Sequence, residues 1–299
     1  MVDRPTVLIA GGNGNVGGGA AMELARCGAQ IVLLGRKSNA LDARADRIRA
    51  ELTGQGHEDP VIQTLEADLS DQVSVRRVAA EALDRFPAID GLILSVVYLG
   101  QHGPTIQADG HEQTFATNVI GPFLLTQLLI ERLARSEAMV LHVVAPFYEP
   151  IDWDDLESIG DYDGEKPYHR SKTMNRIMAA ELARRYEGRI SSVAFDPGFI
   201  IDKHDPTLKD RWPSGFTGLY WRALTALIAK PPRVVGEPMA DLMLTTADHQ
   251  ALNGALVKLG KRVTKLDEAM TDEAAGRRLW NELVRMTEPA PQATAVTAG

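Results

Sequence analysis

The alternation of short apolar segments with longer segments of helical pattern constrains the fold more than any other feature of this sequence. Apolar runs lie at 7–10 and 31–34. Such runs alternate with segments in which apolar residues recur every three or four positions, as at 41–52. A strand that is apolar at every position has both faces buried, and the intervening helices cover it. The pattern therefore predicts an α/β fold with a single doubly wound parallel sheet and helices on both faces.

The rest of the chain continues this alternation. Further strands are expected at 61–65, 89–97, 139–144 and 190–195, and further helices at 20–26, 73–86, 110–135 and 168–186. We find no internal repeat and no interdomain linker, so residues 1–287 are expected to form one domain. The final segment, 288–299, is rich in Pro, Ala and Thr and is expected to be disordered.

Composition excludes several classes of function. The chain has 299 residues, 44% of them hydrophobic, which is enough for a sizeable core. Its formal net charge of −8 disfavours binding to nucleic acid, and its single cysteine, Cys27, excludes a disulfide framework. No apolar run approaches the ~20 residues of a membrane span, the opening residues do not form a signal peptide, and the histidines show no metal-ligand spacing. We expect a cytoplasmic protein without nucleic-acid, membrane or metal binding.

Residues 11–19 form a glycine cluster between the first expected strand and the first expected helix. The cluster contains the spacing G-x-G-x-x-G at 12–17, in which glycines allow a tight turn and let the backbone approach a pyrophosphate at a helix N-terminus. Its position between a buried strand and a helix makes it a dinucleotide-binding signal rather than a flexible turn. Gly18 and Gly19 each cost a helix about 1 kcal/mol relative to Ala, so we expect close backbone packing there.

Basic residues follow the second expected strand, at Arg36 and Lys37. Sites for NAD usually carry an acidic residue at this position to bind the ribose hydroxyls, whereas an Arg accommodates the 2′-phosphate of NADP(H). The sequence therefore predicts NADP(H) as the cofactor. The alternative is a solvated basic turn.

Tyr168 and Lys172 are four residues apart, which places them on one face of a helix. A free Tyr hydroxyl has a pKa of about 10, and a cation nearby favours tyrosinate and lowers that pKa. With the glycine cluster upstream, this pair resembles the short-chain dehydrogenase/reductase family, most closely its retinol dehydrogenase and WW-domain oxidoreductase-like branch. Other segments with the same likeness are Asp68-Leu69-Ser70, Asn118 to Phe123, Trp153 to Leu156, Asp196-Pro197-Gly198 and Asp272 to Trp280.

The resemblance implies a Rossmann-type domain at 1–287, with a substrate lid at about 200–233, and a set of site residues. It implies that Tyr168 is the acid/base, that Lys172 lowers its pKa and holds the nicotinamide ribose, and that Asn118 positions a proton-relay water. The cofactor-binding residues that it implies are Gly11, Asn13, Gly14, Asn15, Val16, Gly17, Arg36, Lys37, Asp68, Leu69, Ser95, Tyr168, Lys172, Pro197 and Gly198.

The sequence departs from the family pattern at two places. Ala145 stands where the family has the Ser that hydrogen-bonds the substrate carbonyl, and Ser95-Val96-Val97 replaces the usual N-A-G. Losing one donor to a developing oxyanion typically costs ~10²–10³ in rate. Tyr148 is a candidate replacement donor, whereas strand alternation predicts that His142 packs away from the site.

Three functions remain open on this sequence. The first is an NADP(H)-dependent oxidoreductase with an atypical active site, acting on a carbonyl, alcohol or activated C=C of a hydrophobic small molecule. The second is a non-redox cyclase, isomerase or dehydratase that uses Tyr168 as acid/base, and the third is a silent NADP(H)-binding protein. Aromatic residues in the expected lid favour a hydrophobic, polycyclic or polyketide-like substrate of secondary metabolism: Trp212, Phe216, Tyr220 and Trp221.

A homodimer or homotetramer is expected from the long helices near 110–135 and 168–186. Leu124, Leu125, Leu128 and Leu129 give the first of these helices more apolar surface than one face of a sheet needs.

Overall fold

A computed structural model describes residues 4–100, 103–160, 162–202, 227–260 and 268–288. The expected tail from 289 onward and most of the expected lid, 203–226, lie outside the described residues. In the described ranges, no helix is both long enough and apolar enough to cross a membrane, and no group of His, Cys, Asp or Glu side chains could hold a metal ion.

The described residues form a parallel sheet with the strand order β3-β2-β1-β4-β5-β6-β7. The strands are β1 Thr6–Ala10, β2 Gln30–Gly35, β3 Ile62–Glu66, β4 Gly91–Leu94, β5 Met139–Val143, β6 Ser191–Asp196 and β7 Leu256–Lys258. The order reverses between β1 and β4, which is the arrangement of a doubly wound Rossmann sheet. The predicted fold class is therefore confirmed. The sequence pattern gave no sign of β7, which has only three residues.

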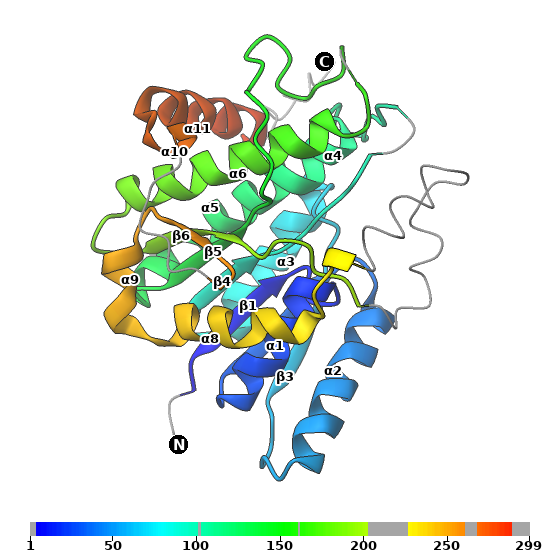
Figure 1. Ribbon diagram of the computed structural model, residues 1–299, viewed down its shortest axis with the longest axis vertical. Helices are drawn as coiled ribbons and strands as arrows, with labels where there is room; N and C mark the ends of the chain where they lie inside the picture. The colour runs from blue at the N-terminus through cyan, green and yellow to red at the C-terminus, as the bar shows by residue number, and fades with distance from the viewer. Residues whose placement is uncertain (1–3, 101–102, 161, 203–226, 261–267, 289–299) are drawn as a thin grey trace, which may run out of the picture.

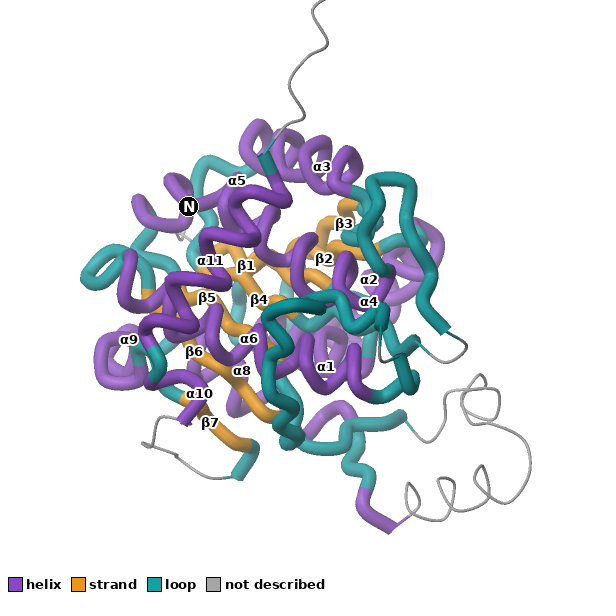
Figure 2. Tube along the Cα trace, turned by 90° about the horizontal axis from the view of Figure 1, so that it is seen from above, coloured by secondary structure: helices purple, strands orange, loops and turns teal. Residues whose placement is uncertain are grey.

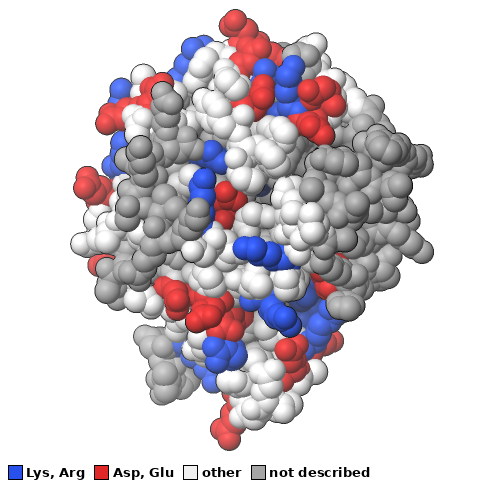
Figure 3. Space-filling model, in the orientation of Figure 1, with Lys and Arg blue, Asp and Glu red and all other residues white. Residues whose placement is uncertain are grey.

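Helices cover both faces of the sheet, as Figures 1 and 2 show. They are α1 Asn15–Arg26, α2 Ser38–Gly54, α3 Gln72–Arg85, α4 Gln113–Phe115, α5 Gly121–Arg135, α6 Lys166–Arg185, α8 Gly236–Leu244, α9 Thr246–Leu252, α10 Glu268–Thr271 and α11 Glu273–Thr287. Helices α1, α2 and α8 pack on one face, and α3, α5, α6 and α11 pack on the other. On the surface in Figure 3, acidic and basic side chains are interspersed.

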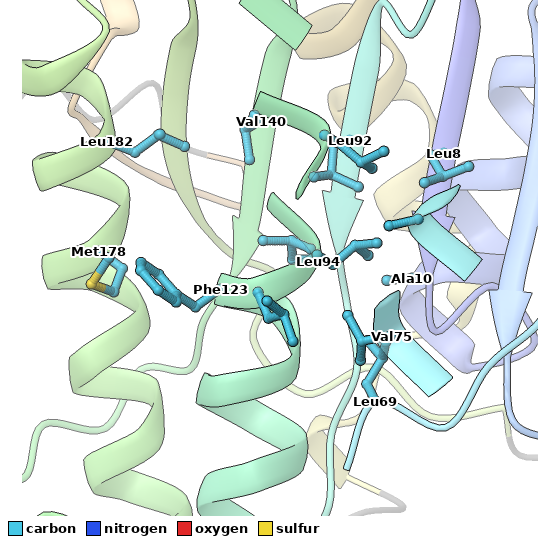
Figure 4. Close-up of a cluster of buried hydrophobic side chains, with 14 of the residues drawn as sticks. Leu8, Ala10, Leu69, Val75, Leu92, Leu94, Phe123, Val140, Met178 and Leu182 are labelled. Atoms are coloured by element: carbon cyan, nitrogen blue, oxygen red, sulfur yellow. The ribbon is translucent and has the colours of Figure 1, made fainter. Parts of the chain in front are cut away.

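Side chains of each central strand alternate between two cores. In β1, Leu8 and Ala10 pack toward α3, α5 and α6, whereas Val7 and Ile9 pack toward α1 and α8. All four are at most 1% exposed. Figure 4 shows the first of these cores, in which Leu92 and Leu94 of β4 lie between Leu8 of β1 and Phe123 of α5. The continuous apolar runs of the sequence thus correspond to strands buried on both faces.

The helix predicted over 110–135 is interrupted in the structure. The short helix α4 is followed by a π-helical turn at Ala116–Ile120, and regular α-helix resumes at Gly121. Pro122 has no N–H to donate to the carbonyl of Asn118 four residues earlier, so a regular α-helical bond cannot form there. The expected strand over 89–97 is also shorter, because β4 ends at Leu94. The π-helical turn and the early end of β4 both lie at the edge of the sheet where the site is.

The two glycines in the first turns of α1 have the close packing that we expected. A Cβ at Gly18 would lie 2.9 Å from Cζ of Arg44, and one at Gly19 would lie 2.3 Å from the carbonyl oxygen of Pro232. Arg44 also donates to the carbonyl oxygen of Asn13 at 3.1 Å. Gly18 therefore makes room for a side chain of α2 that holds the glycine-rich loop.

Helix α11 covers the outer face of α5 and α6. Trp280 of α11 meets Phe123 of α5 edge-on, with ring centroids 5.2 Å apart. Leu124, Leu125 and Leu129 are buried within the single chain, at 2% exposure or less. Three of the four leucines on which the oligomer prediction was based are therefore already buried, Leu128 is partly buried, and the homo-oligomer stays a prediction.

Candidate active site and cofactor groove

A groove of about 540 Å³ opens at the carboxyl ends of the strands, at the point where the strand order reverses. Ligands of open α/β sheets bind at this kind of position. The predicted cofactor-binding residues that line it are Gly11, Asn13, Gly14, Asn15, Val16, Arg36, Lys37, Leu69 and Ser95. The remaining ones lie outside this lining: Gly17, Asp68, Tyr168, Lys172, Pro197 and Gly198.

The glycine-rich loop closes tightly on itself. Gly11 has a φ of 84°, and its carbonyl oxygen accepts a hydrogen bond from the N–H of Gly14 at 2.9 Å. A Cβ at Gly17 would lie 2.5 Å from that carbonyl oxygen and 2.7 Å from Oγ of Ser95. Ser95 in turn donates to the carbonyl of Ala10 at 2.7 Å. Gly17 thus shapes the loop from behind, which explains why it is not in the lining of the groove.

The far end of the groove is basic. Arg36 and Lys37 line it and are exposed, and no described residue in the lining is acidic. Asp68 lies nearby, but its carboxylate accepts from the N–H and the hydroxyl of Ser70, at 2.9 and 2.7 Å. Asp68 therefore holds the turn after β3 and leaves Leu69 to contact a ligand. The arrangement favours an anionic group at this end.

Lys172 lies buried at the ends of β4 and β5. Its Nζ donates to the carbonyl of Val143 at 3.1 Å and is 3.4 Å from that of Val96. It also lies 5.9 Å from the centre of the Tyr168 ring, so the structure brings the predicted pair together. Burial lowers the pKa of Lys172 to about 8.

The acidity of Tyr168 differs from the sequence prediction. Burial, together with the negative charge of Asp196, raises the pKa of Tyr168 to about 12. We expected the nearby lysine to lower the pKa of Tyr168. In the protein without a bound ligand this expectation is wrong, because the pKa is raised. The reason is that the loss of hydration around the phenol disfavours tyrosinate, and the negative charge of Asp196 adds to this effect.

Asp196 is a site residue that the sequence analysis placed in a turn but gave no role of its own. It ends β6, is 4% exposed, and accepts a hydrogen bond from the N–H of Gly198 at 2.9 Å. Ala194, two residues earlier, packs against α6, so alternation puts Asp196 on the face of the sheet that α6 covers. Tyr168 begins that helix. A buried carboxylate therefore belongs to the surroundings of Tyr168.

Both polar atoms of the Asn118 side chain form hydrogen bonds. Its Oδ1 accepts from the N–H of Tyr98 at 2.7 Å, and its Nδ2 donates to the carbonyl of Tyr98 at 3.0 Å and to Oγ of Ser171 at 3.1 Å. It is fully buried within the π-helical turn. Asn118 thus joins the segment after β4 to α6, and its side chain acts by fixing the walls of the site.

Ala145, the residue that the sequence analysis compared with the family's Ser, follows β5 and is 4% exposed. Its carbonyl oxygen accepts a hydrogen bond from Arg176 of α6. Beyond it, the ring of Phe147 lies 4.6 Å from that of His169 and 6.2 Å from that of Phe199. Tyr148, our candidate replacement donor, is 54% exposed. This side of the site is therefore mostly aromatic.

Several known proteins are similar to this chain in sequence or in fold. The sequence model described as "short chain dehydrogenase" matches residues 5–146. Mouse retinol dehydrogenase 14 is 31% identical over 94% of this chain and 85% of its own length. Among solved structures, a blue fluorescent protein from a metagenomic library in complex with NADPH has a TM-score of 0.63 at 20% identity, over 89% of this chain and 98% of that one. An NAD⁺-bound xylitol dehydrogenase has a TM-score of 0.62 at 16% identity, over 85% and 97%.

These likenesses extend over almost the whole described chain and agree with the reversal of strand order, the glycine-rich loop and the Tyr–Lys pair. The resemblance inferred from sequence motifs is confirmed, and retinol dehydrogenases are among the relatives. The chain belongs to the short-chain dehydrogenase/reductase family.

Proposed function

We propose that this protein is an NADP(H)-dependent oxidoreductase that acts on a carbonyl, alcohol or activated C=C of a hydrophobic small molecule. The observation that carries the proposal is the position of Tyr168 and Lys172, a proton-transfer group and a buried cation held together at the carboxyl edge of the sheet. Because a cofactor groove opens at the same edge, proton transfer and hydride transfer can take place side by side.

The residues of the groove fit a dinucleotide. Gly11 and Gly14 line the groove without side chains, so phosphates can approach the backbone of the loop and the N-terminus of α1. Arg36 and Lys37 supply the positive charge that a 2′-phosphate requires, with no described acid in the lining to repel it. Buried next to the groove, Oγ1 of Thr117 has no partner among the described residues. These features support NADP(H), and the related structure that holds NADPH is in keeping with them.

When bound, the cofactor supplies or accepts a hydride. The protein's own part is to move the proton: the Tyr168 hydroxyl donates it to the substrate oxygen during reduction, or accepts it during oxidation. Lys172 remains a cation at neutral pH, because its pKa of about 8 is above 7, and so stabilises the tyrosinate that reduction leaves behind. Asn118 keeps the two walls of the site in place through Tyr98 and Ser171.

The surroundings support an apolar substrate. Val97 and Leu99 line the groove and are 52% and 50% exposed, and Phe147 is 36% exposed beside the aromatic rings of the site. Large apolar side chains that remain exposed around a cleft are typical of binding surfaces.

A non-redox reaction is the second candidate, and Ala145 is the observation that favours it. A cyclase, isomerase or dehydratase needs an acid at Tyr168 but not the carbonyl-polarising hydroxyl that Ala145 lacks. The high pKa of Tyr168 suits an acid that stays protonated until it acts.

The two candidates are separated by incubating the purified protein with NADPH and a panel of hydrophobic ketones, while NADPH absorbance and product mass are both followed. Our proposal expects NADPH to be consumed together with the ketone, and expects this to stop in Tyr168→Phe, which keeps the ring and loses the proton. Product formed without consumption of NADPH would establish the second candidate. Turnover that survives Tyr168→Phe within a few fold would refute both.

A further inference from the structure

Two buried nitrogen atoms behind the active site have no hydrogen-bond partner among the described residues. They are Nε2 of Gln127 on α5 and Nε2 of His142 on β5. His142 is 7% exposed and does not line the cofactor groove, but it shares a small cavity with Asn118. Buried polar atoms in folded proteins are, as a rule, bonded to protein or to ordered water, because an unmade hydrogen bond is costly. Each of these atoms therefore requires a partner.

Both side chains line the same cavity, which has a volume of about 20 Å³. A water molecule needs about 10–15 Å³, so there is room for one. The cavity lies between α5, β5, α6 and α11, next to the apolar side chains Phe123 and Met178 that Figure 4 labels. Thr126 also lines it, and because its hydroxyl donates to the carbonyl of Pro122 at 2.8 Å, that oxygen can still accept.

The chemistry of the two atoms is complementary to water. The amide nitrogen of Gln127 can only donate, whereas Nε2 of a neutral His accepts or donates according to its tautomer. Water can accept from Gln127 and then either donate to His142 or accept from it. Burial and the nearby charge of Lys172 lower the pKa of His142 to about 3, so this ring is neutral at physiological pH.

We propose that one ordered water molecule occupies this cavity and bridges Gln127 and His142. The water joins α5 to β5 directly behind the catalytic groups. His142 precedes Val143, whose carbonyl holds Nζ of Lys172 at 3.1 Å. A second, smaller cavity of about 10 Å³ is lined by His142 and by Asn118. This site does not depend on the identity of the cofactor or the substrate.

The test is a double-mutant cycle on thermal unfolding of the full chain, with Gln127→Leu, His142→Leu and the combined variant. If water bridges the two side chains, each single change removes one partner of the water and weakens its hold on the other side chain, so each lowers Tm by about 2–4 °C. The double variant removes both polar atoms and lowers Tm by less than the sum. Met178→Leu, an apolar change in the lining of the same cavity, is the matched control and leaves the coupling unchanged.

A dry cavity predicts the opposite sign. Replacing an unpaired buried nitrogen with an apolar side chain would then raise Tm in each single variant, or the two shifts would simply add, and either result overturns the proposal. The unmodified protein offers an independent measurement if a variant does not fold. A crystal structure that shows a water within hydrogen-bond distance of both Nε2 atoms supports the bridge, and an empty cavity refutes it.

Discussion

Replacing Asp196 with Asn isolates the effect of one buried charge on the catalytic tyrosine. The amide oxygen of Asn can still accept the hydrogen bond from the N–H of Gly198, so the turn keeps its geometry while the charge is lost. The pKa of Tyr168 is raised from 10.0 to about 12, and burial is a larger cause than Asp196. The charge therefore accounts for less than half of the rise, and Asp196→Asn is expected to lower the pKa of Tyr168 by less than about 1.

The assay is the pH dependence of kcat/KM for alcohol oxidation with NADP⁺, in which Tyr168 accepts the proton and activity rises with pH. In Asp196→Asn the midpoint moves to lower pH. Below the midpoint, the variant is up to about tenfold faster than the unmodified protein at the same pH. Among the described residues, Lys172 and His169 also lie near Tyr168, and both remain in the variant. Glu237→Gln, which neutralises a carboxylate on α8 at the opposite face of the sheet, is the control.

A midpoint that stays in place or moves to higher pH in Asp196→Asn would contradict this reasoning. It would mean that the charge of Asp196 does not reach Tyr168 and that burial alone sets the pKa of the phenol.

Three further predictions follow from the site. Arg36→Ala is expected to weaken NADPH binding by about 5- to 150-fold, the range of one charge-assisted hydrogen bond, and to leave NADH binding unchanged; equal losses for both cofactors would contradict the role of Arg36. Ala145→Ser is expected to raise ketone turnover, by up to ~10²–10³, if the protein is a carbonyl reductase, and to leave a non-redox reaction unchanged or slower. Light scattering at micromolar concentration tests the predicted homodimer or homotetramer, and a monomer would refute it.

The local parts of the site could be predicted from sequence because their spacing determines their geometry. A spacing of four positions from Tyr168 to Lys172 places both on one face of a helix wherever that helix lies. A glycine cluster between a buried strand and a helix likewise indicates a phosphate loop. The structure additionally shows which atoms lie close to Gly17. The fold class was predictable for the same reason, since apolar runs such as that of β1 are simply strands with two buried faces.

Features that depend on tertiary packing could not be predicted. The pKa of Tyr168 depends on how much water is excluded around it and on the charge of Asp196, which the fold brings from β6. Strand β7 has only three residues, which are too few to show the alternation typical of a strand. The leucines of α5 were interpreted as a surface for another copy because nothing in their own segment indicates how the rest of the chain buries them. The break before α5, in contrast, has a local signal in the sequence, because Pro122 removes a backbone donor and so suits a bent helix.

The central claim is that the groove is built for a 2′-phosphorylated dinucleotide that works with Tyr168. Parallel titrations of the unmodified protein with NADPH and with NADH, followed by quenching of protein fluorescence, test it most directly. We predict saturable binding of both, with NADPH tighter by at least about fivefold because of Arg36 and Lys37. Equal dissociation constants for the two cofactors, or no binding of either, would contradict the account.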